Sequence, residues 1–495
     1  MEKTFKHFLF ASLIFATLLA GCDKPKPEPE PEPEPETPKS TECVLKSFKV
    51  NIETGALEGF VDQTDKSIEI SYMPNEYEFL AAATAEYEIS DKATISPDPA
   101  SVTDYTAGEV KFTVTAEDGT TKSEYTVFIA AAEFNVATEK VWTKTYGELG
   151  LAASVTNMCG VGFVSVNNFA TSDLNVYDLS GAKVGTLNIE GIPGLDAGTQ
   201  LAAMSNDENG VLVAMARYDG TYADGSTGKI SEIYGWLDGW NAKPTLIYKM
   251  EYECNYMSVS GDVKGDFVLT IRTGAANPQM HHVLAYKGGK YFKEDGGSAA
   301  TWAGPMIQHP GNDGCWGQLL SFFTGNPEDG FVCWDSVGAA EMGESGNASS
   351  AFYVYDEGLS AFQAGNANEV ALRGGVSWTT WDADGRWFGY GNFSTGHVRA
   401  FVYNGQKYVI ACSGSWPCNW ITIQKANNLT EDDEATEDVD ESKQNYLLET
   451  DIIEGAAQCY PCCAYVYDPA TGTGHVIYLS QSSAAVAYDI KTNRI

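Results

Sequence analysis

Basic residues are scarce in this chain. Its 495 residues include 31 Lys and Arg against 67 Asp and Glu, which gives a formal net charge of -36. Because so much negative charge repels phosphate backbones and anionic membrane surfaces, we expect no nucleic-acid partner. Beyond residue 22, no apolar run reaches the ~18 residues that a membrane-spanning helix requires. Hydrophobic residues still make up 43% of the chain, enough to bury the cores of two or three domains.

The motifs of common enzymes are also absent. The sequence contains no Gly-x-Ser-x-Gly, no His-Glu-x-x-His, no phosphate-binding glycine loop and no dinucleotide fingerprint. The chain has 6 histidines, and those beyond the N-terminal segment are not paired at metal-ligand spacing. We therefore predict no catalytic residue, no metal ligand and no cofactor. A glycosidase remains open, because a sequence with 67 acids does not reveal which two carboxylates would form a pair.

The first residues carry an export signal. Two lysines precede an apolar run from Phe8 to Ala20, which is followed directly by Gly21 and Cys22. A short apolar run that ends in small residues before a cysteine is typical of a secretory signal whose cysteine becomes acylated. We expect a signal peptide over residues 1–21 and lipidation at Cys22, so that the lipid alone anchors the protein to a membrane.

Residues 22–40 predict a stiff stalk. Between Asp23 and Glu36, proline alternates with lysine or glutamate. This pattern favours an extended polyproline II conformation, and the repeated glutamates add charge repulsion. An acidic stretch directly after the lipidated cysteine resembles the export tag of lipoproteins displayed by Bacteroidetes. That resemblance implies an outer-membrane lipoprotein facing the extracellular side.

Residues 41–133 predict an Ig-like β-sandwich. Val110–Ala116 and Tyr125–Ala130 alternate apolar and polar residues on either side of an Asp-Gly turn, which predicts an antiparallel hairpin with one buried face. About ninety residues of such short strands suit an Ig-like fold. Together with Gly59–Asp62 and Thr94–Pro97, this hairpin resembles the Ig-like modules at the N-termini of Bacteroidetes surface lipoproteins, which implies a spacer role.

Residues 134–495 predict a large all-β domain, because short strands alternate with Gly, Asn and Asp turns and helical periodicity is absent. A strand ending in Tyr and followed by a turn recurs at spacings of about fifty residues. One such meander buries its faces only by stacking on neighbours, so we predict a β-propeller of about six or seven blades. A pair of β-sandwiches or a jelly roll is the alternative. The recurring tyrosines are Tyr177, Tyr286, Tyr355, Tyr403, Tyr467 and Tyr488.

Tryptophan is concentrated in the predicted propeller. The chain has 11 tryptophans, and all but Trp142 lie between Trp236 and Trp420, several of them beside turn residues. An exposed flat ring with polar neighbours suits the apolar face of a sugar, whereas a buried ring would fill the wedge between two blades. Both interpretations stay open for each residue. The candidate ligand-binding residues are Trp236, Trp240, Trp316, Trp378, Trp381, Trp416 and Trp420.

The order of signal, stalk, Ig-like module and Trp-rich β-domain resembles Bacteroidetes surface lipoproteins, including the accessory glycan-binding proteins of polysaccharide-uptake systems. The resemblance implies a non-catalytic surface protein that captures a polysaccharide or oligosaccharide on aromatic rings of its distal domain. Two alternatives stay open. One is an adhesion or envelope-assembly protein whose propeller binds a surface protein. The other is an extracellular glycan hydrolase or lyase.

Overall fold

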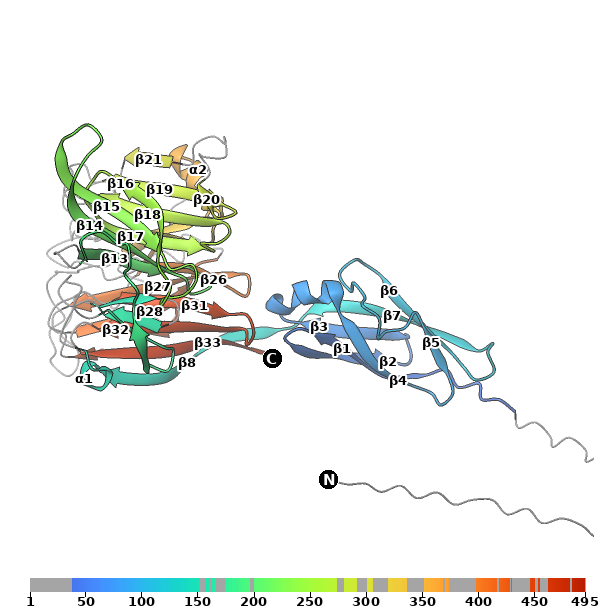
Figure 1. Ribbon diagram of the computed structural model, residues 1–495. Coiled ribbons are helices and arrows are strands. Elements are labelled where there is room, and N and C mark those ends of the chain that lie inside the picture. The colour runs from blue at the N-terminus through green and yellow to red at the C-terminus, as the bar shows by residue number, and fades with distance from the viewer. Residues whose placement is uncertain are drawn as a thin grey trace, which may run out of the picture.

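The computed structural model shows an N-terminal β-unit connected to a larger β-unit (Figure 1). The helices among the described residues are short: η1 (Pro74–Ala82), α1 (Tyr146–Leu149), η4 (Pro327–Asp329) and α2 (Gly358–Gln363). None of these described helices is long and apolar enough to cross a membrane. The all-β prediction is confirmed. The described residues are 38–151, 156–159, 162–165, 174–195, 200–273, 280–291, 301–305, 319–335, 351–367, 370–373, 398–415, 418–427, 429, 446–449, 453–454, 462–480 and 483–494.

The N-terminal module, residues 38–133, is built on one sheet with the strand order β4-β1-β2-β3-β7-β6-β5. Its β3 and β7 pair in parallel, and the other neighbours are antiparallel. The backbone of Ala83 bonds to Thr103, which brings the β4 edge to the chain beyond β5 and nearly closes the sheet. The Ig-like sandwich therefore stays a prediction. The strands are β1 (Leu45–Ile52), β2 (Gly55–Asp62), β3 (Ser67–Tyr72), β4 (Thr84–Ile89), β5 (Thr94–Ser96), β6 (Val110–Thr115) and β7 (Lys122–Ala131).

The module forms the hairpin that its sequence predicts. Alternate residues of β6, Phe112 and Val114, are fully buried in the core. In the turn, the Asp118 carboxylate accepts hydrogen bonds from the backbone N–H groups of Thr120 and Thr121, each at 2.8 Å. Gly119 has a φ of 74°, a left-handed conformation that glycine adopts without steric cost. Local sequence is therefore sufficient to form this turn.

The larger unit contains six antiparallel sheets among the described residues, each with a path of four strands. The first three comprise β9 (Thr156–Cys159), β10 (Gly162–Ser165), β11 (Asn175–Tyr177) and β12 (Lys183–Thr186); β13 (Gln200–Asn206), β14 (Leu212–Thr221), β15 (Thr227–Gly235) and β16 (Thr245–Met250); and β17 (Cys254–Gly261), β18 (Phe267–Thr273), β19 (Met280–Lys287) and β20 (Lys290–Tyr291), with β21 (Thr301–Pro305) on β19.

The other three sheets complete the unit. They comprise β22 (Leu319–Phe322), β23 (Phe331–Asp335), β24 (Ala351–Tyr355) and β25 (Val370–Arg373); β26 (Val398–Tyr403), β27 (Gln406–Ser415), β28 (Cys418–Lys425) and β29 (Tyr446–Glu449), with β30 (Ile453–Glu454) on β28; and β31 (Cys462–Asp468), β32 (Thr473–Ser480), β33 (Ala484–Arg494) and β8 (Phe134–Thr145).

These six sheets are the blades of a propeller. Their first strands contact one another in a closed cycle, in the order β9, β13, β17, β22, β26, β31 and back to β9. The last blade takes its fourth strand from the start of the unit, because β8 pairs with β33 along its whole length. This pairing of early and late strands closes the ring and leaves no open end to the array of blades. Six blades, counted over the described residues, lie within the predicted range.

The recurring tyrosines lie mainly in the blade cores. Tyr177, Tyr355 and Tyr403 are each no more than 3% exposed. The rings of Phe401 and Tyr465 stack with centroids 3.9 Å apart, which joins the fifth blade to the sixth. The repeat in the sequence is therefore a packing signal, because each blade must bury large side chains against the next.

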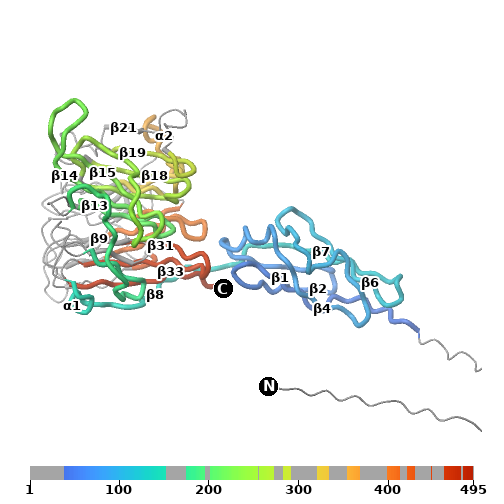
Figure 2. Tube along the Cα trace, in the orientation of Figure 1, coloured from blue at the N-terminus to red at the C-terminus, as the bar shows by residue number. Residues whose placement is uncertain are grey.

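The module joins the propeller through β7 and β8, with only Ala132 and Glu133 between the two strands. Figures 1 and 2 show η1 beside one end of the propeller, where the β26–β27 and β31–β32 turns lie. We call this end the module face and the opposite end, which carries α1, the far face. The short connection places specific elements of the two units against each other.

Candidate functional site

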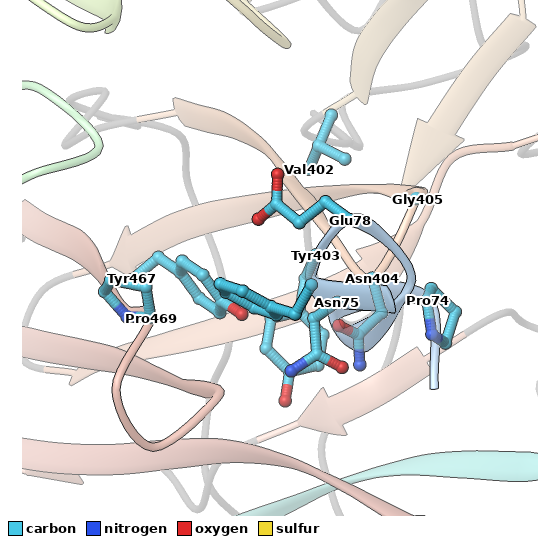
Figure 3. A pocket seen from close by; sticks show the side chains of 10 residues that line it. Pro74, Asn75, Glu78, Val402, Tyr403, Asn404, Gly405, Tyr467 and Pro469 are labelled. Atoms are coloured by element: carbon cyan, nitrogen blue, oxygen red, sulfur yellow. The ribbon is translucent and has the colours of Figure 1, made fainter. Parts of the chain in front are cut away.

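A pocket of about 210 Å³ lies where the module meets the propeller (Figure 3). We call it the module–propeller pocket. It combines aromatic rings, two amide side chains and one carboxylate. The lining residues are Pro74, Asn75, Glu78 and Phe79 from η1, Val402, Tyr403, Asn404 and Gly405 from the β26–β27 hairpin, and Tyr467 and Pro469 at the end of β31.

The η1 side of the pocket follows from local sequence. Pro74 occupies the first turn, where its missing N–H costs nothing. The backbone N–H of Met73 donates to the Glu76 carboxylate at 2.7 Å, and Leu80 is fully buried in the module core. η1 is a 3-10 helix, in which residues three apart share one face, so Asn75 and Glu78 project together. Phe79 follows Glu78 directly, and all three line the pocket.

The propeller side is a two-residue hairpin. Tyr403 pairs with Gln406, and Asn404 and Gly405 between them have φ values of 48° and 71°. Asn-Gly is the sequence that most favours this tight turn, because both central positions require positive φ. The Asn404 amide donates to the Thr492 hydroxyl. Its Oδ1 atom is buried and has no hydrogen-bond partner within the described part of the chain.

Two tyrosines form the base of the pocket. The Tyr403 hydroxyl donates to the Gly472 carbonyl at 2.8 Å and accepts from Thr492 at 3.0 Å. The Tyr467 ring meets the Tyr403 ring edge-on, with centroids 6.0 Å apart. Burial raises the pKa of both phenols, and the carboxylates of Glu78 and Asp468 raise the pKa of Tyr467 further. Both hydroxyls therefore stay protonated at neutral pH.

Gly472 lies at the contact between the two units. The Tyr467 hydroxyl hydrogen-bonds the side chain of Asn75, which ties β31 to η1. Gly472, in the β31–β32 turn, has a φ of 65°, and a Cβ there would lie 2.9 Å from Nδ2 of Asn75. A side chain at this position would strain the backbone and displace the Asn75 amide, and glycine avoids both.

The pocket offers hydrogen-bonding groups and aromatic rings to a ligand. Glu78 is the only carboxylate among its lining residues, whereas glycoside hydrolysis ordinarily uses two. Across the described residues, no group of three or more His, Cys, Asp or Glu side chains could hold a metal ion. Amide and carboxylate oxygens can accept hydrogen bonds from hydroxyl groups, and the aromatic rings offer apolar contact.

A second polar cluster lies inside the ring of blades. Arg399 on β26 is 5% exposed, and its guanidinium donates to the Ser205 hydroxyl at 3.1 Å. Burial lowers the pKa of Arg399, and the neighbouring Glu208 and Asp207 oppose that shift. The Asp207 carboxylate accepts from the backbone of Val263 at 3.0 Å. The cluster therefore connects the second, third and fifth blades.

Tryptophan placement corrects part of the sequence interpretation. Trp236 is 1% exposed, and its indole N–H donates to the Asn188 carbonyl at 2.7 Å. Its ring therefore has no free face for a sugar. Trp240 is half-buried over Gly185, where an added Cβ would come within 2.3 Å of its ring. Both residues belong to the second blade and pack against the first, where the Trp240 ring fills the space left by Gly185.

The other candidates cannot be brought together from the described residues. Trp420 lies on β28, but its side chain is not among those described. Ser415 at the end of β27 and Cys418 at the start of β28 flank Trp416 in sequence. Both strand ends lie at the far face, opposite the β26–β27 turn. The candidates outside the described residues are Cys22, Trp316, Trp378, Trp381 and Trp416.

An exposed aromatic pair lies on the solvent-facing side of the module's sheet. Phe60 and Phe128 are 70% and 56% exposed. Both flank Glu69, because Phe60 pairs with Glu69 on β3 and Glu69 pairs with Phe128 on β7. The resemblance of this segment to Ig-like modules implied only a spacer role. In the alternation of buried and exposed residues along β2 and β7, both phenylalanines fall on the exposed side. This pattern could have been recognised from the sequence.

Comparison with known proteins is informative for the module. Residues 45–129 match the family model described as SGBP, N-terminal, the N-terminal part of surface glycan-binding proteins. The match supports the resemblance of this part of the chain to surface glycan-binding proteins of Bacteroidetes. No curated protein matches the chain.

Several solved structures are similar to the chain at low identity. A putative glycoside hydrolase from Bacteroides thetaiotaomicron is 13% identical, with 53% of this chain and 88% of that chain covered and a TM-score of 0.16. Trypanosoma rangeli sialidase is 9% identical over 82% of this chain and 56% of its own, with a TM-score of 0.29. The soluble aldose sugar dehydrogenase of Escherichia coli is 12% identical over 72% and 99%, with a TM-score of 0.30. Scores this low carry no argument about activity.

Proposed function

We propose that this protein captures a polysaccharide or oligosaccharide at the cell surface without cleaving it. The match of residues 45–129 to the N-terminal model of surface glycan-binding proteins carries the proposal. The module–propeller pocket supports it, because its rings and hydrogen-bonding groups suit a sugar and its lining has a single carboxylate.

The arrangement at the membrane belongs to the same proposal. Lipidation at Cys22 would anchor the chain in the outer membrane, and the stalk over residues 22–40 would hold the folded part away on the extracellular side. An Ig-like module over residues 41–133 and a propeller over residues 134–495 would then be the two domains. No cofactor and no metal are part of the proposal.

A glycan array with the soluble chain from Asp23 to Ile495 tests this function, followed by a hydrolysis assay on every glycan that binds. We expect binding without release of products. Product release would instead identify an extracellular hydrolase or lyase. Absence of binding to any glycan would contradict the proposal and favour an adhesion or envelope-assembly protein that binds a surface protein.

A further inference from the structure

The module and the propeller, which the sequence predicts as separate domains, form the module–propeller pocket together. The module contributes one face of η1, and the propeller contributes the β26–β27 hairpin and the end of β31. We infer that this pocket is a saccharide site that holds one neutral pyranose unit, such as the end of a glycan chain. The inference rests on the proposed function and adds the place and class of the ligand.

The size of the pocket sets the size of the ligand. Its volume of about 210 Å³ is below the ~300–1,000 Å³ of pockets that enclose drug-sized molecules. Phe79 and Tyr467 are half-buried, so part of each ring remains available to the apolar face of a sugar. A single ring with hydroxyls at its edge fits such a small aromatic and polar space.

Two hydrogen-bond acceptors at the pocket could bind a ligand. Asn404 Oδ1 is a buried acceptor without a partner among the described residues, and a ligand hydroxyl can reach it once the Asn404 side chain turns toward the pocket that it lines. An unpaired buried acceptor costs free energy that a ligand hydroxyl would recover. The Glu78 side chain is exposed and lines the same space, so its carboxylate can accept from a second hydroxyl (Figure 3). Two acceptors on opposite walls would orient a sugar between the units.

Charge at the pocket excludes acidic sugars. The lining contains Glu78 and no Lys, Arg or His. Asp468 adjoins Tyr467, and the chain as a whole carries a formal charge of -36. A uronate would meet only negative charge here, since no basic side chain lines the pocket to pair with it. Neutral sugars are therefore the expected class.

Saturation-transfer NMR with the soluble chain from Asp23 to Ile495 tests the inference. The probes are the methyl glycosides of glucose, galactose, mannose, N-acetylglucosamine and glucuronic acid. We expect transfer to at least one neutral probe and none to the glucuronide. Glu78→Gln and Asn404→Gly should each weaken that binding about tenfold or more, because the first replaces a charged acceptor with a weaker neutral one and the second removes an acceptor. Glycine keeps the positive φ of position 404.

Two controls separate binding from folding. Glu88→Gln changes an exposed glutamate of the same module that does not line the pocket, and it should bind like the wild type. Melting curves should show both pocket variants folded. A second pair of variants tests the side of the pocket that the module forms. Phe79→Ala should lose binding, whereas Phe60→Ala, which changes an exposed residue of β2 away from the pocket, should keep it.

The outcomes distinguish the inference from the proposed function. If the array detects glycans but no methyl glycoside binds, or if the pocket variants bind like Glu88→Gln, the inference is wrong and surface glycan capture stands. Loss of binding on replacing Trp416 and Trp420 together, with the pocket variants unaffected, would place the site on the far face. If the array detects nothing, the proposed function itself fails.

Discussion

The two polar clusters of this protein differ in what surrounds them. Arg399 and its acidic neighbours lie inside the ring of blades, whereas Glu78 and Asn404 lie at the open junction of two units. In the first cluster, protein groups supply most of the partners, including Ser205 and the backbone of Val263. Each cluster has one buried atom without a partner among the described residues, Arg399 Nε in the first and Asn404 Oδ1 in the second. The difference is that Glu78 and Asn404 line a pocket, so the second cluster has space beside it for a ligand.

Removing the buried cation should have the largest effect. Arg399→Met leaves Asp207 and Glu208 without their opposite charge inside the ring, so we expect a loss of about 3–5 kcal/mol in the free energy of unfolding. Denaturant titration measures it. The matched control is Lys243→Met, which breaks an exposed pair with Glu190 and should cost less than about 1 kcal/mol. Equal losses in both variants would show that the inner cluster does not hold the blades together.

Disturbing the junction should have an intermediate effect. Gly472→Ala introduces a Cβ against Asn75 at a φ of 65°, whereas Gly365→Ala introduces one into open space at a φ of 71°. Backbone strain costs about 1–2 kcal/mol in either case. Only Gly472→Ala should also loosen η1 from the propeller, and cleavage after the exposed Glu133 by a glutamate-specific protease should then accelerate. The same cleavage rate in both variants would mean that the contact does not fix the module.

The smallest effect concerns pH. His282 on β19 is half-buried, and burial lowers the pKa of its imidazole below 6.5. The unfolded chain therefore binds a proton at a higher pH than the folded protein does. The stability contributed by the neutral ring is fully present above pH 6.5 and is lost as the pH falls through the folded pKa. We expect the unfolding free energy of the wild type to fall more steeply on acidification than that of His282→Gln. Parallel curves would contradict this assignment.

Much of the fold was readable because its signals are local. Alternation over Val110–Ala116 with an Asp-Gly turn predicted the hairpin that forms, and the recurring strand-turn tyrosines predicted stacked blades. Which side chains are buried was harder to predict from the sequence. Trp236 stands beside Gly235, which suggested a loop, yet it packs at 1% exposure because its indole N–H finds the Asn188 carbonyl. The residues next to a tryptophan in the sequence do not show which distant residues will pack against its ring.

The sequence by itself determined the β-character of both units, the tight turn at Asn404 and Gly405, and the strong negative charge, since each depends on residues close together or on composition alone. Only the tertiary structure decided that η1 meets the β26–β27 hairpin and Tyr467, which are more than three hundred residues away in the chain. β8, which follows the module directly, is held in the ring by its pairing with β33, and the glycine at position 472 leaves room for Asn75. Such long-range contacts leave no periodic pattern in the sequence, because each involves a different pair of distant segments.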